Sequence, residues 1–237
     1  MKRFLDPTAL LFIVILAFIS ITSGRFQSPQ AWFIHTLMIL PGIVIGLSFH
    51  EAAHAFSAYK LGDNTPKFQG RVTISPRSHI DPIGMVALFF IGFGWGVPVQ
   101  INPFNFKKRR RDEMIVALSD VTMNFIIAFL FMGLVKLLYT LSLPFLYTSF
   151  GSVTVDVLLY VVQINLILMV FNLMPVPPLD GFSVLTQVFN LEKREWYGKV
   201  YNKGMTILLI LIVFGVLGRV IFPSVNFLYT FLYRLFF

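Results

Sequence analysis

Residues 39–60 read ILPGIVIGLSFHEAAHAFSAYK, an apolar run that carries two histidines and a glutamate. The run lies within a longer apolar stretch, 32–60, which exceeds the roughly 17–25 residues that a membrane-spanning helix needs. An ionisable side chain at the centre of such a helix costs about 2.5–3.5 kcal/mol or more, so its presence indicates a functional site. This stretch therefore predicts a membrane helix that carries chemistry.

His50 and His54 are four positions apart, so a helix presents both imidazoles on one face. That spacing suits a zinc ion at about 2.0–2.1 Å from each coordinating nitrogen. Glu51 follows the first histidine and can act beside the metal as a general base without being a ligand. Two histidines leave a catalytic zinc short of a third protein ligand, with a fourth position open for water.

A second polar element, at 172–181, reads NLMPVPPLDG. Its three prolines, Pro175, Pro177 and Pro178, cannot continue a helix, so the apolar span before them must unwind there. Unwound backbone at membrane depth is tolerated where it is buried in protein or lines a wet cavity. Asp180 follows directly and is the candidate for the third zinc ligand.

The composition of the chain is typical of an integral membrane protein. It is 57% hydrophobic and 13% charged, with 27 Phe and a mean hydropathy of +0.78 over 237 residues. These values predict an α-helical polytopic membrane protein with a single domain over 1–237. The absence of cysteine excludes disulfides, thiolate metal sites and a catalytic thiol. The net charge is +8, and the basic residues lie beside apolar runs, which indicates contact with anionic lipid rather than nucleic acid.

Five apolar runs predict membrane spans, at 8–23, 32–60, 113–140, 153–175 and 205–222. The first could instead be a cleaved signal peptide, but we favour an uncleaved span because no soluble domain follows it for export. The tail 227–237 is too short to cross, and we expect it to lie along the interface or to pack on the helices.

The run 83–95 would rise only about 20 Å as a helix, against a hydrocarbon core of about 30 Å. We therefore expect a re-entrant segment there rather than a sixth crossing. The alternating pattern of 71–75 and the segment 97–101 predict two short strands, a small β element at the cytoplasmic side.

The distribution of basic residues predicts the orientation. With this topology one face receives 15 of the 19 Lys and Arg residues: Lys2, Arg3, Lys60, Lys67, Arg71, Arg77, Lys107, Lys108, Arg109, Arg110, Arg111, Lys193, Arg194, Lys199 and Lys203. The positive-inside rule makes this face cytoplasmic, so the N-terminus is cytoplasmic in a multi-pass protein of the cell membrane. His54 then lies six residues, about 9 Å along a helix, from Lys60 at the cytoplasmic end. The predicted site lies in the cytoplasmic half of the bilayer.

Together these motifs resemble the site-2 protease family, intramembrane zinc metalloproteases of peptidase family M50. Further stretches are similar to its short bacterial branch, which lacks a PDZ domain: 61–63, 70–73, 79–84, 94–99 and 102–103. The resemblance covers roughly 33–185, leaving the spans 8–23 and 205–222 peripheral. It implies one Zn²⁺ per chain bound by His50, His54 and Asp180, with Glu51 activating the attacking water. It also implies that Asn172 and Asn124 contact the substrate or its oxyanion, and that the substrate is a transmembrane protein or peptide.

The chain departs from the family in one helix. Asp120 and Val121 stand where a Gly-Pro pair usually precedes Asn124. Two other functions therefore remain open. An ion-relay transporter would use Asp120, Asp180 and the histidines, and a catalytically inactive relative would only bind membrane partners.

Overall fold

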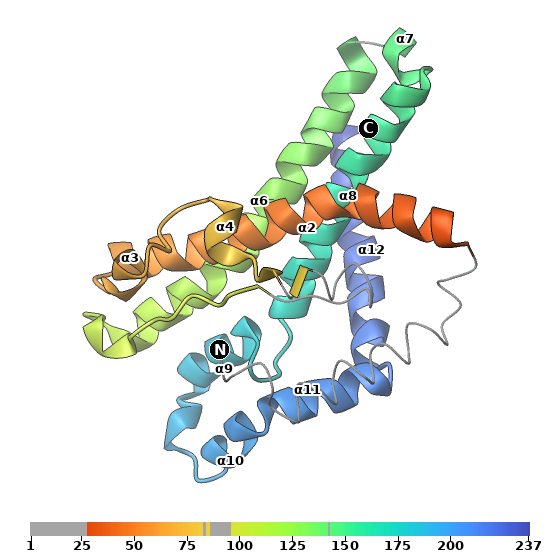
Figure 1. The fold of residues 1–237 in the computed structure, drawn as a ribbon. Helices are drawn as coiled ribbons and strands as arrows, with labels where there is room; N and C mark the ends of the chain where they lie inside the picture. Colours follow the sequence, from red (N-terminus) through yellow and green to blue (C-terminus); the bar gives the residue numbers. More distant parts are fainter. Residues whose placement is uncertain (1–27, 83, 86–95, 142) are drawn as a thin grey trace.

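The computed structural model describes residues 28–82, 84–85, 96–141 and 143–237, and within them the chain is built from helices (Figure 1). Four are long: α2 (Pro29–Lys60), α6 (Arg109–Leu141), α8 (Ser149–Asn172) and α12 (Val216–Phe236). The shorter ones are α3 (Thr65–Phe68), α4 (Pro76–His79), η2 (Pro103–Asn105), α7 (Leu143–Leu146), α9 (Asp180–Phe189), η3 (Leu191–Lys193), α10 (Tyr197–Asn202) and α11 (Gly204–Val213).

Among the described residues, four helices are long and apolar enough to cross a membrane: Gln30–Lys60 within α2, and the whole of α6, α8 and α12. The predicted spans 32–60, 113–140 and 153–175 correspond to the first three of them. The predicted span 8–23 and nearly all of the predicted re-entrant segment, 83–95, lie outside the described residues.

The predicted span 205–222 is wrong. The chain breaks at Gly215, whose φ of 67° lies in the left-handed region that glycine adopts readily. The break leaves α11 with 10 residues, which rise only about 15 Å. The helix that is long and apolar enough to cross is α12, which continues through Pro223 into the tail that we expected to lie along the interface or to pack on the helices. Leu232 of that tail is fully buried in the core that α12 forms with α6 and α8.

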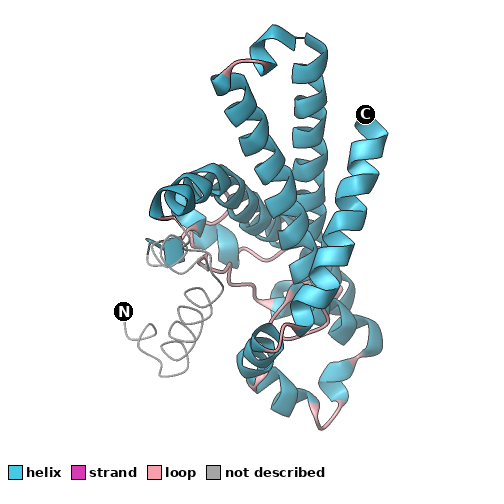
Figure 2. Ribbon diagram, turned by 90° about the vertical axis from the view of Figure 1, so that its right-hand side faces the viewer, coloured by secondary structure: helices cyan, strands magenta, loops and turns pink. Residues whose placement is uncertain are grey.

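The predicted β element is also wrong: no strand occurs in the described parts of the chain, as Figure 2 shows. The backbone of 71–75 makes local turn bonds instead, with Thr73 N donating to Arg71 O and Ser75 N donating to the Thr73 hydroxyl. Side chains that satisfy nearby backbone groups compete with a sheet ladder in this way. What remains of pairing is one antiparallel bridge between Ile80 and Gly96.

Helices α2, α6 and α8 contact one another (Figure 1). Gly42 and Gly46 of α2 face α8, where an added Cβ would lie 3.1 Å from Val161 Cα or 2.6 Å from Leu168 Cδ1. Small residues spaced four apart let membrane helices approach closely. The glycine pair therefore brings the backbone of α8 against α2 just before the histidines.

Asp63 fastens the end of α2 to the segment before α6. Its buried carboxylate accepts hydrogen bonds from Thr65 N and Oγ1, from Asn102 N at 2.7 Å and from Asn105 Nδ2 at 2.7 Å. Burial by itself would raise the pKa of this carboxyl, but these hydrogen bonds outweigh it and lower the pKa below its ordinary value. Asp63 therefore stays ionised and fixes the turn that follows the histidine helix.

Candidate metal centre

His50 and His54 project from the same face of α2, as the sequence predicts. Their ring centroids lie 5.5 Å apart with the planes at 82°. His50 is 5% exposed, and the His54 side chain is 13% exposed. Both Nε2 atoms face carboxylates that come from two other helices.

Asp180 reaches the histidines because α8 ends at Asn172 and a short loop turns the chain into α9. Asp180 is the first residue of α9, and its Oδ1 lies 3.2 Å from His54 Nε2. The turn is tight: a Cβ on Gly181 would lie 2.2 Å from Leu173 O. Leu179, which precedes Asp180, is buried in an apolar cluster with residues of α11 and α12, so packing fixes the loop.

Asp120 of α6 supplies a second carboxylate to the same space. Its Oδ2 lies 2.8 Å from His54 Nε2 and 3.2 Å from His50 Nε2, whereas Asp180 Oδ2 lies 3.8 Å from His50 Nε2. Asp120 is completely buried. His50, His54, Asp120 and Asp180 each offer one ligand atom, and these atoms all lie within 4.8 Å of one another.

The donor set fits a zinc ion. Two donors about 2.1 Å from a tetrahedral zinc lie about 3.4 Å apart, and the four nitrogen–oxygen separations run from 2.8 to 3.8 Å. Imidazole nitrogens and carboxylate oxygens are both ordinary zinc ligands.

A buried hydrogen-bond chain fixes which nitrogen of His50 can bind the metal. Asn124 donates from Nδ2 to Gly46 O at 3.3 Å and to Asn165 Oδ1 at 2.9 Å, and Asn165 Nδ2 donates to Val161 O at 2.8 Å. The Oδ1 of Asn124 is left as an acceptor, 2.8 Å from His50 Nδ1. His50 therefore carries its proton on Nδ1 and presents the lone pair of Nε2 to the metal side.

Glu51 is not a member of the ligand cluster. Its Oε2 accepts a hydrogen bond of 2.9 Å from Val99 N, in the segment predicted as a strand. That segment is tied to the end of α4, since Val97 N donates to His79 O at 2.7 Å. The backbone of 97–99 thus orients the carboxylate one residue away from the first histidine.

Asn124 and Asn172, the predicted contacts to substrate, lie in different settings. Asn124 is fully buried behind His50, whereas Asn172 ends α8 and donates from Nδ2 to Leu168 O of the same helix at 3.0 Å. Neither placement tests a role in substrate binding, which stays a prediction for both residues.

The sequence alone groups Asp120 with Asp180 and the histidines only in the ion-relay alternative and does not predict it in the metal cluster. A signal was present: Asp120 and Asn124 are four positions apart in one apolar helix and so share a face. A carboxylate and an amide on one face of a membrane helix point toward a shared polar site.

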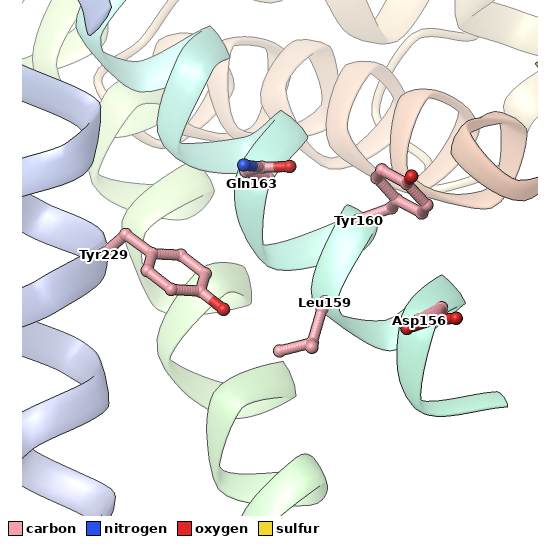
Figure 3. A pocket seen from close by; sticks show the side chains of 5 residues that line it. All are labelled: Asp156, Leu159, Tyr160, Gln163 and Tyr229. Carbon is pink, nitrogen blue, oxygen red and sulfur yellow. The ribbon is translucent and has the colours of Figure 1, made fainter. Parts of the chain in front are cut away.

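A separate cavity of about 220 Å³ lies between α8 and α12. Figure 3 shows Asp156, Tyr160 and Gln163 projecting from α8 and Tyr229 from α12 around it, together with Leu159. None of the four residues of the metal cluster lines this cavity. The polar face of α8 there is distinct from the metal centre.

Comparisons with known proteins identify the family of this chain. The family model described as peptidase family M50 matches residues 140–215, which include Asp180 but not the histidines. The chain is similar to "Putative zinc metalloprotease YwhC" of Bacillus subtilis, with 34% identity over 81% of this chain and 89% of the relative. It is also similar to "Putative zinc metalloprotease Rip2" of Mycobacterium tuberculosis, with 26% identity over 87% of this chain and 78% of the relative.

The search of solved structures found no significant match. The similarity to the Bacillus relative nevertheless extends over most of both chains, and the family match covers the element that delivers Asp180. This chain belongs to peptidase family M50.

Proposed function

We propose that the chain is an intramembrane zinc metalloprotease that hydrolyses peptide bonds of transmembrane substrates. The observation that carries the proposal is the convergence of His50, His54 and Asp180 from α2 and α9, with Glu51 beside them but outside the ligand cluster. Family membership and the names of the relatives support the same chemistry.

The residues divide the work as follows. His50, His54 and Asp180 would hold the zinc, one ion per chain. Zinc bound there supplies a Lewis acid and lowers the pKa of its water to about 7. Glu51 takes the proton of the attacking water and passes it to the leaving amine. Asn124 holds the His50 ring in the tautomer that binds metal through Nε2.

The proposed orientation places the site in the cytoplasmic half of the bilayer. His54 precedes the end of α2 at Lys60 by six residues, about 9 Å. The basic start of α6 lies at the same end of the helices as α9 and η3, since Arg109 Nη2 lies 3.1 Å from Glu192 Oε2 and Arg110 donates to Gln187 O. This basic end faces the cytoplasm by the positive-inside rule.

Glu51→Gln tests the proposal. The variant keeps the side-chain shape and an oxygen toward Val99 N, so we expect one zinc per chain and cleavage reduced by about 10²–10⁴-fold. The readout is proteomic comparison of membranes carrying wild type or the variant, in which uncut substrate helices accumulate with the variant. His54→Ala is the matched control, which should lose both zinc and cleavage.

The two alternatives predict other outcomes. Ion flux that survives Glu51→Gln, with no accumulated substrate, would support a transporter. Membranes that are identical for wild type, Glu51→Gln and His54→Ala would support an inactive relative.

A further inference from the structure

Asp120 places its carboxylate on the metal side of both imidazoles. Its Oδ2 lies 3.2 Å from His50 Nε2 and 2.8 Å from His54 Nε2. Asp180 approaches the same two nitrogen atoms, at 3.8 and 3.2 Å. The two carboxylates therefore converge on one point, and each is at least as close to His54 as to His50.

A carboxylate that only orients a metal-binding histidine contacts the ring nitrogen that does not bind the metal. For His50 that position is taken, because Asn124 Oδ1 accepts from Nδ1 at 2.8 Å. Asp120 contacts Nε2 instead, the atom whose lone pair the Asn124 hydrogen bond leaves for the ion. The two residues therefore differ in their contact with His50. Asn124 holds the ring through Nδ1, and Asp120 lies beside Nε2, in the position of a metal ligand.

Burial points the same way. Asp120 has no exposed surface, and its Oδ2 has no hydrogen-bond partner of acceptable geometry among the described residues, although two nitrogen atoms lie nearby. Its Oδ1 is held by Val121 N at 2.6 Å. A buried carboxylate needs a paired charge or a metal ion. With Asp180 it brings two carboxylates toward two imidazoles, a donor set suited to a divalent cation.

We propose that Asp120 is a fourth protein ligand of the zinc and that it fills, in the resting protein, the position that water takes in a catalytic zinc site. This inference rests on the proposed function, since it assumes that zinc binds at this centre. Catalytic zinc sites have three protein ligands and an open position, whereas four protein ligands make a closed site. Water could then bind only if Asp120 left the zinc or the zinc took a fifth ligand, so we expect the protease to rest in a closed state.

The first test replaces the proposed ligand by a thiol in a chain that has no cysteine of its own. Asp120→Cys loaded with Co²⁺ should show a thiolate-to-cobalt charge-transfer band in the near ultraviolet, because thiolate is a good ligand for such ions. Val121→Cys is the control: its side chain is also buried but points about 100° away around the helix. A band in both variants, or in neither at one cobalt per chain, would overturn direct ligation by Asp120.

The second test compares the wild-type chain with Asp120→Ala. Wild type loaded with Co²⁺ should relax the protons of bulk water hardly more than the zinc-loaded protein, because no exchanging water occupies the closed site. Asp120→Ala should raise this relaxation at saturating cobalt and lower zinc affinity by about tenfold or more in a chelator competition. Strong relaxation by wild type would show an open position and overturn the closed state. An Asp120→Ala variant with the water relaxation and the zinc affinity of wild type would also overturn the closed state.

The outcomes separate this inference from the proposed function. If the wild-type chain binds neither zinc nor cobalt, both the proposed function and the role of Asp120 are refuted. If the wild-type chain binds one ion, strongly relaxes the protons of bulk water and cleaves substrate, the proposed function stands and only the role of Asp120 is refuted.

Discussion

Replacing Asn124 by alanine should weaken zinc binding without removing any zinc ligand. The Asn124 side chain makes three buried hydrogen bonds, to His50 Nδ1 at 2.8 Å, Asn165 Oδ1 at 2.9 Å and Gly46 O at 3.3 Å. In Asn124→Ala the Nδ1–H of His50 loses its acceptor in a buried setting. The ring can then rotate or shift its proton to Nε2, and either change removes the lone pair that faces the metal.

The expected magnitude follows from two comparisons. Loss of a residue that orients a metal-binding histidine costs about 10–100-fold in metal affinity, which corresponds to about 1.4–2.8 kcal/mol. An orphaned buried donor costs about 1–3 kcal/mol, the same range. We therefore expect the zinc dissociation constant of detergent-purified Asn124→Ala, measured by chelator competition, to rise by about 10–100-fold.

Thr122→Ala is the matched control on the same helix. Thr122 is exposed and its hydroxyl donates to Leu118 O of the same helix, so the zinc affinity of Thr122→Ala should stay that of wild type. Equal zinc affinity of Asn124→Ala and Thr122→Ala would refute the claim that the Asn124 amide fixes the His50 tautomer.

Two further predictions concern the start of α9 and the turn that follows α2. Gly181→Ala should displace the start of α9, because the new Cβ would meet Leu173 O at 2.2 Å, and zinc affinity should fall by at least about tenfold; Gly198→Ala, where nothing lies within 4 Å, should leave it unchanged. Asp63→Asn should lower the unfolding free energy near neutral pH by about 1–3 kcal/mol, because charge-assisted hydrogen bonds such as that from Asn105 are weakened. The pKa of Asp63 is lowered in the folded state, so this stabilisation is present above the unfolded pKa of about 3.9 and is lost as the pH falls through the folded pKa. Thermal unfolding of wild type and Asp63→Asn as a function of pH checks this prediction. A difference in stability between them that persists unchanged at the lowest pH would contradict its assignment to the Asp63 charge.

The spans that the sequence predicted well are those whose apolar runs end at strong local signals. Lys60 ends α2 within the predicted run, and the prolines after Asn172 end α8. The span at 205–222 failed because its end depends on Gly215, whose left-handed backbone divides one apolar run into two helices. The strand at 71–75 failed because alternation cannot reveal that nearby side chains and turns already satisfy the backbone.

The sequence by itself determined the chemistry that one helix can display. The spacing of His50 and His54 puts two imidazoles on one face of α2, and the prolines before Asp180 force an unwound element at membrane depth, because these are local consequences of helix geometry. Only the tertiary structure decided that Asp120 of α6 meets the same two nitrogens and that Asn124 reaches His50. Those contacts depend on how three helices pack, which no periodicity within a single helix reveals. Gly42 and Gly46 permit the close approach of α2 and α8, and Asn165 of α8 in turn accepts a hydrogen bond from Asn124.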